Sequence, residues 1–95
     1  MAVYIIVEVE VHDAAGYEDY KKLTPQSLIA YQGKFIVRGG ATETLEGEWK
    51  PQRIVVLEFP TKELATQWWS SEEYAPAKEI RQRTASTRMI LVEGV

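Results

Sequence analysis

Apolar and polar residues alternate along the beginning of the chain. From Val3 to Val11 every second residue is valine or isoleucine, a period of two that predicts a strand. Three later segments also have strand character: residues 34–45, 53–59 and 87–93. The segment 34–45 contains Gly39-Gly40, which indicates a bulge or a close approach of another group to the backbone.

Between these strands the apolar residues recur at steps of three and four, which predicts helices. Asp13 is a suitable N-cap for the first helix, and Gly33 is expected to end it. Pro25 falls inside this helix and is expected to kink or divide it. Its buried stripe is predicted to consist of Tyr17, Tyr20, Thr24, Leu28 and Tyr31.

A second helical region follows the third strand. Thr61 is placed to cap it, and the spacing of Ser70 and Glu73 is that of a capping box, which begins a further helical segment. The resulting order is strand, helix, strand, strand, helix, strand. This order predicts an α+β fold over residues 1–95, a single ferredoxin-like βαββαβ sandwich with an antiparallel sheet and its helices on one face.

The predicted sheet is apolar on both faces, although helices on one side can cover only one of them. The third strand has Ile54 and Val56 on one side and Val55, Leu57 and Phe59 on the other. The last strand has Met89 and Leu91 on one side and Ile90 and Val92 on the other, and Tyr4 and Ile6 add to the mixed face of the first strand. Exposing such side chains forfeits roughly 1.5–3 kcal/mol each relative to burial. We therefore expect a homodimer that packs through this sheet face. The alternative is that extra helical turns or the C-terminal tail cover it.

Composition narrows the function classes. The 95 residues carry a net charge of −3 with scattered basic residues, which argues against nucleic acid and an anionic membrane. The chain has no cysteine and one histidine, so we expect no metal site and no cofactor. The N-terminus has neither a basic leader nor an uninterrupted apolar stretch, and we expect a cytoplasmic protein.

Three runs of the chain are distinctive: GKFIVRGG at residues 33–40, LEG at 45–47 and RIVVLEFP at 53–60. They are accompanied by Asp13, Tyr17, Tyr20, Ala65, Trp68, residues 71–74, Lys78, Arg81 and residues 93–94. Together these positions resemble the domain-of-unknown-function family 1330. The resemblance covers almost the whole chain and implies the dimeric α/β-barrel superfold. Members of that superfold include cofactor-free monooxygenases, lactone isomerases and haem enzymes, but the family has no established reaction. Lys34 departs from the family, which often has a second glycine there.

Arg38 and Glu58 are the first candidates for a site. A hairpin turning near residues 47–49 would place them opposite one another on a face with apolar neighbours. A plain cross-strand salt bridge explains this pair, because a charge on such a face is usually partnered. In the functional alternative, Arg38 holds a ligand anion, Glu58 orients it, and Gly39 and Gly40 let the ligand approach.

Other residues complete the candidate site. Arg53 and Arg81 suit recognition of a carboxylate, with surface ion pairs as the alternative. Trp68 and Tyr74, with Tyr17 and Tyr20, are expected either to line a cleft or to fill the core.

The candidates for catalysis are weaker. His12, beside Asp13, and Glu58 are the candidates for a catalytic base, although a histidine at a strand end is usually a solvated loop residue.

Two functions compete. The first is a protein that binds a small, carboxylate-bearing molecule between helices and sheet, with or without cofactor-independent catalysis. The second is a non-catalytic dimeric module that binds a metabolite or a protein. A pocket of roughly 300 Å³ or more containing Arg38 favours the first, and a filled core with Arg38 paired to Glu58 favours the second. A haem enzyme, the third reading, would have only His12 as a histidine ligand.

Overall fold

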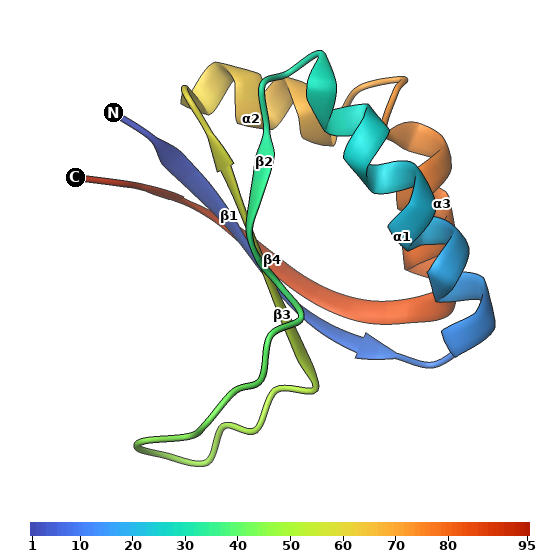
Figure 1. The fold of residues 1–95 in the computed structure, drawn as a ribbon, viewed down its shortest axis with the longest axis vertical. Helices are drawn as coiled ribbons and strands as arrows, with labels where there is room; N and C mark the ends of the chain where they lie inside the picture. The colour runs from blue at the N-terminus through green and yellow to red at the C-terminus, as the bar shows by residue number, and fades with distance from the viewer.

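A computed structural model describes residues 1–95 and has the predicted order of elements (Figure 1). The second helical region is divided into two helices. The elements are β1 (Val3–Val11), α1 (Ala14–Ile29), β2 (Lys34–Arg38), β3 (Arg53–Phe59), α2 (Lys62–Trp69), α3 (Ala75–Thr84) and β4 (Ala85–Glu93). The strands form one antiparallel sheet in the order β2-β3-β1-β4. This is the predicted ferredoxin-like fold.

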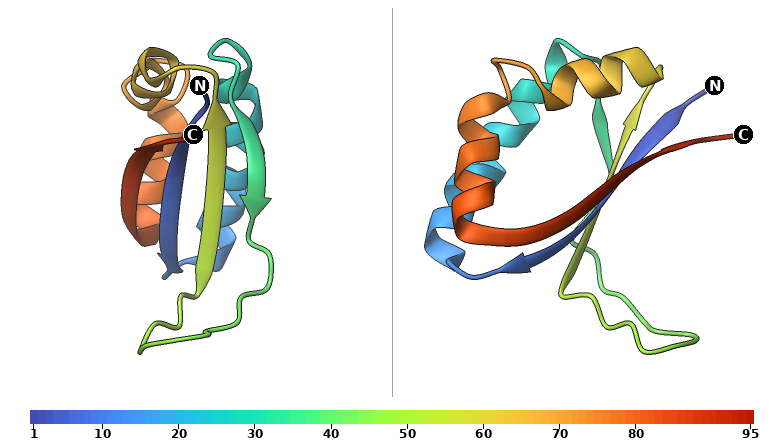
Figure 2. Two further views of the ribbon diagram at one scale, coloured as in Figure 1. Left: turned by 90° about the vertical axis from the view of Figure 1, so that its left-hand side faces the viewer. Right: turned by 180° about the vertical axis from the view of Figure 1, so that it is seen from behind.

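All three helices lie on one side of the sheet, which we call the inner face, and the opposite side is the outer face (Figure 2). Every second residue of β1 and β3 is buried on the inner face. Fully buried aromatic rings join the sheet to the helices: Phe59 and Trp68 have centroids 5.6 Å apart, and Trp68 and Tyr74 have centroids 4.0 Å apart. The core therefore fills only the space between this face and the helices. No helix is long and apolar enough to cross a membrane.

The predicted start of α1 is confirmed, and its predicted end is wrong in detail. The Asp13 side chain accepts a hydrogen bond from the amide of Gly16 at 3.1 Å, and α1 runs through Pro25 without dividing. The residue with a left-handed backbone after the helix is Gln32, at φ 59°, and not Gly33. Position 33 requires a glycine for another reason: a Cβ there would lie 2.6 Å from the Phe59 ring.

The predicted capping box after α2 is displaced by one residue. Ser70 donates to the Thr66 carbonyl, whereas the Ser71 hydroxyl accepts the amide hydrogen of Tyr74 at 3.1 Å. Helix α3 begins directly afterwards. At the start of α2 the prediction is confirmed, since the Thr61 hydroxyl accepts from the amide of Leu64 at 3.2 Å.

Strand β2 is shorter than predicted and has its irregularity elsewhere. It ends at Arg38, and its register shifts between Phe35 and Val37, so the extra residue is Ile36 rather than either glycine. One extra residue exchanges the faces to which the following side chains point. Before this bulge Lys34 lies opposite Glu58 and forms its ion pair, whereas Arg38 lies opposite Val55. The predicted pairing of Arg38 with Glu58 is therefore wrong.

No helix covers the outer face, which is partly apolar. Ile90 is 61% exposed and Val92 is 41% exposed, whereas Tyr4, Ile6, Ile54 and Val56 are half-buried. Neither a helix nor the C-terminal tail covers this face (Figure 2). The alternative explanation for its apolar residues is therefore wrong for the isolated chain.

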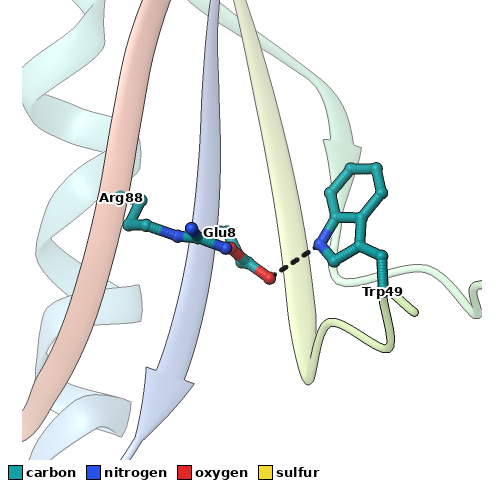
Figure 3. Close-up of polar contacts among 3 residues, drawn as sticks. All are labelled: Glu8, Trp49 and Arg88. Atoms are coloured by element: carbon teal, nitrogen blue, oxygen red, sulfur yellow. Dashed lines mark hydrogen bonds and ion pairs between the residues drawn. The ribbon is translucent and has the colours of Figure 1, made fainter. Parts of the chain in front are cut away.

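A polar cluster of three residues ties the loop between β2 and β3 to the outer face (Figure 3). Trp49, from that loop, donates its indole N–H to Glu8 at 2.9 Å, and the Arg88 Nε donates to the same carboxylate at 2.8 Å. These hydrogen bonds lower the pKa of Glu8. Lys34 Nζ lies 3.0 Å from Glu58 Oε1 and lowers the pKa of that carboxyl in the same way. Two carboxylates of this face, Glu8 and Glu58, are therefore paired with cations.

Candidate functional site

A narrow cleft lies between α1, α3 and the inner face of the sheet; we call it the inner cleft. Its walls are mostly apolar and aromatic, and its polar members are basic or neutral. No aspartate or glutamate lines it. The lining residues are Val7, Val9, Tyr17, Tyr20, Lys21, Thr24, Phe35, Arg38, Arg53, Val55, Leu57, Trp68, Arg81 and Met89.

Three arginines from three different elements meet at the inner cleft: Arg38 of β2, Arg53 of β3 and Arg81 of α3. We call them the arginine cluster. None of the chain's ion pairs includes an arginine of this cluster, because they join Lys21 to Glu18, Lys34 to Glu58 and Arg88 to Glu8. The alternative of surface ion pairs for Arg53 and Arg81 is therefore wrong. The arginine cluster concentrates positive charge with no carboxylate to balance it.

Arg81 is the most deeply buried member, with 4% of its surface exposed. Its Nε donates to the Tyr74 hydroxyl at 3.1 Å, and its Nη1 donates to the Thr87 hydroxyl. Both partners are neutral, so they fix the orientation of the guanidinium without neutralising its charge. A buried cation with only neutral partners stabilises any anion that comes near it.

Arg53 has an unsatisfied polar atom. Its Nε is buried and has no hydrogen-bond partner, which normally costs about 1–3 kcal/mol. The guanidinium carbon lies 5.7 Å from the centroid of the Tyr17 ring. Gly39, at φ 73°, lies against this guanidinium, and a Cβ there would collide with it. The glycine thus leaves room for Arg53, whereas Gly40 has open space around it.

Arg38 crosses from the edge strand β2 to helix α1. Its Nη2 donates to the main-chain carbonyl of Lys21 at 2.7 Å, and its guanidinium carbon lies 4.2 Å from the centroid of the Phe35 ring. Because both Arg38 and Lys21 line the inner cleft, this hydrogen bond spans the cleft. We call it the Arg38 bridge.

Tyrosines form the neutral polar part of the site. The hydroxyls of Tyr20 and Tyr74 are 2.9 Å apart, and Arg81 donates to the second of them. Burial raises the pKa of Tyr17 and, more strongly, that of Tyr20. Both phenols are therefore protonated at neutral pH, and Tyr17 and Tyr20 line the cleft.

The inner cleft is nearly closed. Its cavity volume is about 20 Å³, which is room for about one water molecule. The pocket of roughly 300 Å³ expected for a ligand-binding protein is thus not open in this structure. The competing expectation is not met either, because Arg38 is held by a carbonyl and not by Glu58.

The structure brings together only part of the predicted site. Arg38, Arg53, Arg81 and Trp68 line the cleft, and Tyr74 lies directly behind it. Glu58 is on the outer face, and His12 lies at the end of β1 with its Nε2 2.7 Å from the Ser86 hydroxyl. Gly39, Gly40, His12 and Glu58 are not among the lining residues. No group of three or more His, Asp or Glu side chains is placed to hold a metal ion.

Sequence reasoning missed several lining residues: Lys21, Phe35 and Met89. A signal for Lys21 was present, because Tyr17, Lys21 and Thr24 follow one another at steps of four and three on one helix face. Phe35 gave no such signal. Its inward orientation together with that of Arg38 depends on the bulge at Ile36.

Residues 2–95 match the family model described as a domain of unknown function, DUF1330. A comparison with curated proteins gave no match. Among solved structures, a protein of unknown function from Rhodopseudomonas palustris is similar at TM-score 0.80 and 17% identity, over 99% of this chain and 82% of that chain. A dimeric ferredoxin-like protein of unknown function from a Jannaschia species has TM-score 0.77 and 12% identity, covering 99% and 100%.

One similar structure has a described activity. SnoaB, a cofactor-independent oxygenase from Streptomyces nogalater, is similar at TM-score 0.68 and 14% identity, over 99% of this chain and 93% of that chain. At such identities these likenesses establish the fold alone. The chemistry of the inner cleft must therefore be inferred from the residues that line it.

Proposed function

Since the chain belongs to the DUF1330 family, which has no assigned function, we propose from its site that it binds a small carboxylate-bearing molecule in the inner cleft. The arginine cluster carries this proposal: three guanidinium groups line one cleft that contains no acidic side chain. A carboxylate would supply the missing negative charge and an acceptor for the buried Nε of Arg53. The apolar and aromatic walls suit a ligand with an apolar body.

The test is a thermal-shift and NMR screen of small carboxylates, each compared with its neutral amide. We expect carboxylates to stabilise the protein and to shift the signals of cleft residues, whereas the amides do neither. Arg53→Gln should abolish the effect. The matched control is Arg83→Gln, which removes the same charge from an exposed position on α3 outside the cleft. Equal responses of the two variants would reject the site.

The proposal includes a homodimer that packs through the outer face. Its support is the uncovered apolar surface around Ile90 and Val92, the half-buried neighbours of that surface, and the dimeric state named for the similar Jannaschia protein. Sedimentation velocity tests it directly. A particle with the mass of one 10.8 kDa chain at micromolar concentration would contradict it.

A second candidate is cofactor-independent oxygenation of the bound molecule. The observation in its favour is the fold shared with SnoaB, together with a similar structure from Caulobacter crescentus described as a putative antibiotic biosynthesis monooxygenase. Oxygen uptake in the presence of carboxylates that bind is the test. Binding without uptake would leave a non-catalytic metabolite-binding module, and the absence of binding would favour a module that recognises protein.

A further inference from the structure

Pro25 leaves one carbonyl of α1 without its helical partner. In an α-helix the amide of residue 25 would donate to the carbonyl of residue 21, and proline has no amide hydrogen to donate. The Lys21 carbonyl therefore lacks this helical hydrogen bond, and Lys21 is one of the residues that line the inner cleft. Arg38 Nη2 takes this place as donor at 2.7 Å.

The replacement donor comes from the opposite wall of the cleft. Arg38 belongs to β2, and its guanidinium lies 4.2 Å from the centroid of the Phe35 ring while its side chain is exposed to solvent. The Arg38 bridge thus joins sheet to helix across a cleft of about 20 Å³. No carboxylate competes for Arg38 in the free protein, because its only hydrogen bond is to a neutral carbonyl.

We infer that the Arg38 bridge is exchangeable and selects the ligand: an entering carboxylate takes Arg38 from the Lys21 carbonyl and opens the cleft as it binds. This inference rests on the proposed function. A hydrogen bond from guanidinium to carboxylate is roughly twice as strong as one to a neutral acceptor, and it can be bidentate. A neutral ligand has no such advantage over the carbonyl. Lys21 is a partly exposed residue, so water is available to bond to its freed carbonyl.

The experiment uses benzoate as the anionic probe and benzamide as its neutral counterpart. The variant Pro25→Ala restores the amide that satisfies the Lys21 carbonyl within the helix, so Arg38 is released without being altered. Because a typical hydrogen bond contributes about 0.5–1.5 kcal/mol net, benzoate should bind about 2- to 10-fold more tightly to this variant. Titration calorimetry or NMR gives the affinities.

A double-mutant cycle distinguishes two ways in which Pro25→Ala could change benzoate binding: release of Arg38, or a change in the shape of α1. If Pro25→Ala acts through Arg38, it should have no effect on benzoate binding in the Arg38→Gln background. The same gain in both backgrounds would overturn the inference, as would equal affinities of the wild type and Pro25→Ala.

The result that would reject the proposed function differs from the result that would reject only the exchangeable bridge. If neither the wild type nor Pro25→Ala binds benzoate or any other carboxylate of the screen, both ideas fall. If the wild type binds and Arg53→Gln does not, but Pro25→Ala changes nothing, the anion site stands and only the exchangeable bridge is rejected.

Discussion

The two faces of the sheet differ in whether their charged side chains have partners of opposite charge. On the outer face Glu8 is paired with Arg88 and Glu58 with Lys34, although this face is open to solvent. On the inner face the three arginines of the cluster have no acidic partner, although Arg81 is buried and Arg53 is half-buried. Elementary electrostatics favours the reverse arrangement, because an unpaired charge is more costly inside a protein than at its surface.

The difference separates the roles of the faces. Paired charges among exposed apolar side chains are compatible with a surface that is solvated in the free chain and packs against a second copy. Unpaired cations beside a cleft lower the stability of the empty protein, and violations of this kind concentrate at functional sites. The following predictions test each half of this comparison.

The largest effect is expected on the outer face from Ile90→Glu. Ile90 is opposite Ile6 in the β1–β4 register and is 61% exposed. Two-fold symmetry would bring the new carboxylates into one interface, where charges without partners cost several kcal/mol. We expect the dimer to dissociate at least 100-fold more readily, measured by sedimentation velocity over a range of concentrations.

The control for this variant is Ile29→Glu, which introduces the same charge at a 74% exposed position on the helical side. It should leave the sedimentation coefficient unchanged. Equal behaviour of the two variants would remove the distinction between the outer face and an ordinary surface.

On the inner face, Arg53→Met should stabilise the protein. Methionine keeps much of the apolar stem and removes the buried Nε that has no partner. We expect a gain of about 1–2 kcal/mol in the free energy of unfolding, measured by urea denaturation at fixed protein concentration. The matched outer-face variant, Arg88→Met, should instead show a small decrease in the free energy of unfolding, because it breaks a pair with Glu8. A loss in both variants would contradict the contrast between the faces.

The contrast could be predicted from the sequence only in part. The order of elements and the two faces of β1 followed from periodicity, since a period of two fixes the face of each side chain. In β4 both faces are apolar, so periodicity did not show which of its residues would be uncovered. The same rule failed in β2. A single extra residue at Ile36 turned Arg38 inward, and nothing in the local sequence marks that position as a bulge.

The candidate site was predictable as a set of residue types but not as a geometry. Arg38, Arg53 and Arg81 were singled out because guanidinium groups suit carboxylates, and all three line the cleft. That they lack acidic partners depends on which side chains meet across elements far apart in the chain. The hydrogen bond from Arg38 to Lys21 likewise depends on tertiary packing.

The tyrosines of the inner cleft should limit stability at alkaline pH. Burial raises the pKa of Tyr20 above its ordinary value of 10.0, so its contribution is complete below pH 10 and is lost as the pH rises further. In Tyr20→Phe the unfolding free energy should therefore fall less steeply between about pH 10 and 11.5 than in the wild type, as measured by urea denaturation. Identical slopes would show that this phenol does not limit stability.

The smallest effect is expected at acid pH and belongs to the outer face. Hydrogen bonds from Trp49 and Arg88 lower the pKa of Glu8 below its ordinary value of 4.5. A lowered pKa contributes stability that is complete above pH 4.5 and is lost as the pH falls through the value in the folded state. Glu8→Gln should reduce this loss of unfolding free energy between about pH 5 and 3, whereas Glu43→Gln, in the exposed loop, controls for net charge.

Because arginines stay charged throughout this range, the inner face should add nothing to the loss of unfolding free energy at acid pH. If Arg53→Met changes the loss of unfolding free energy at acid pH and Glu8→Gln does not, the acid sensitivity belongs to the inner face and this prediction is wrong.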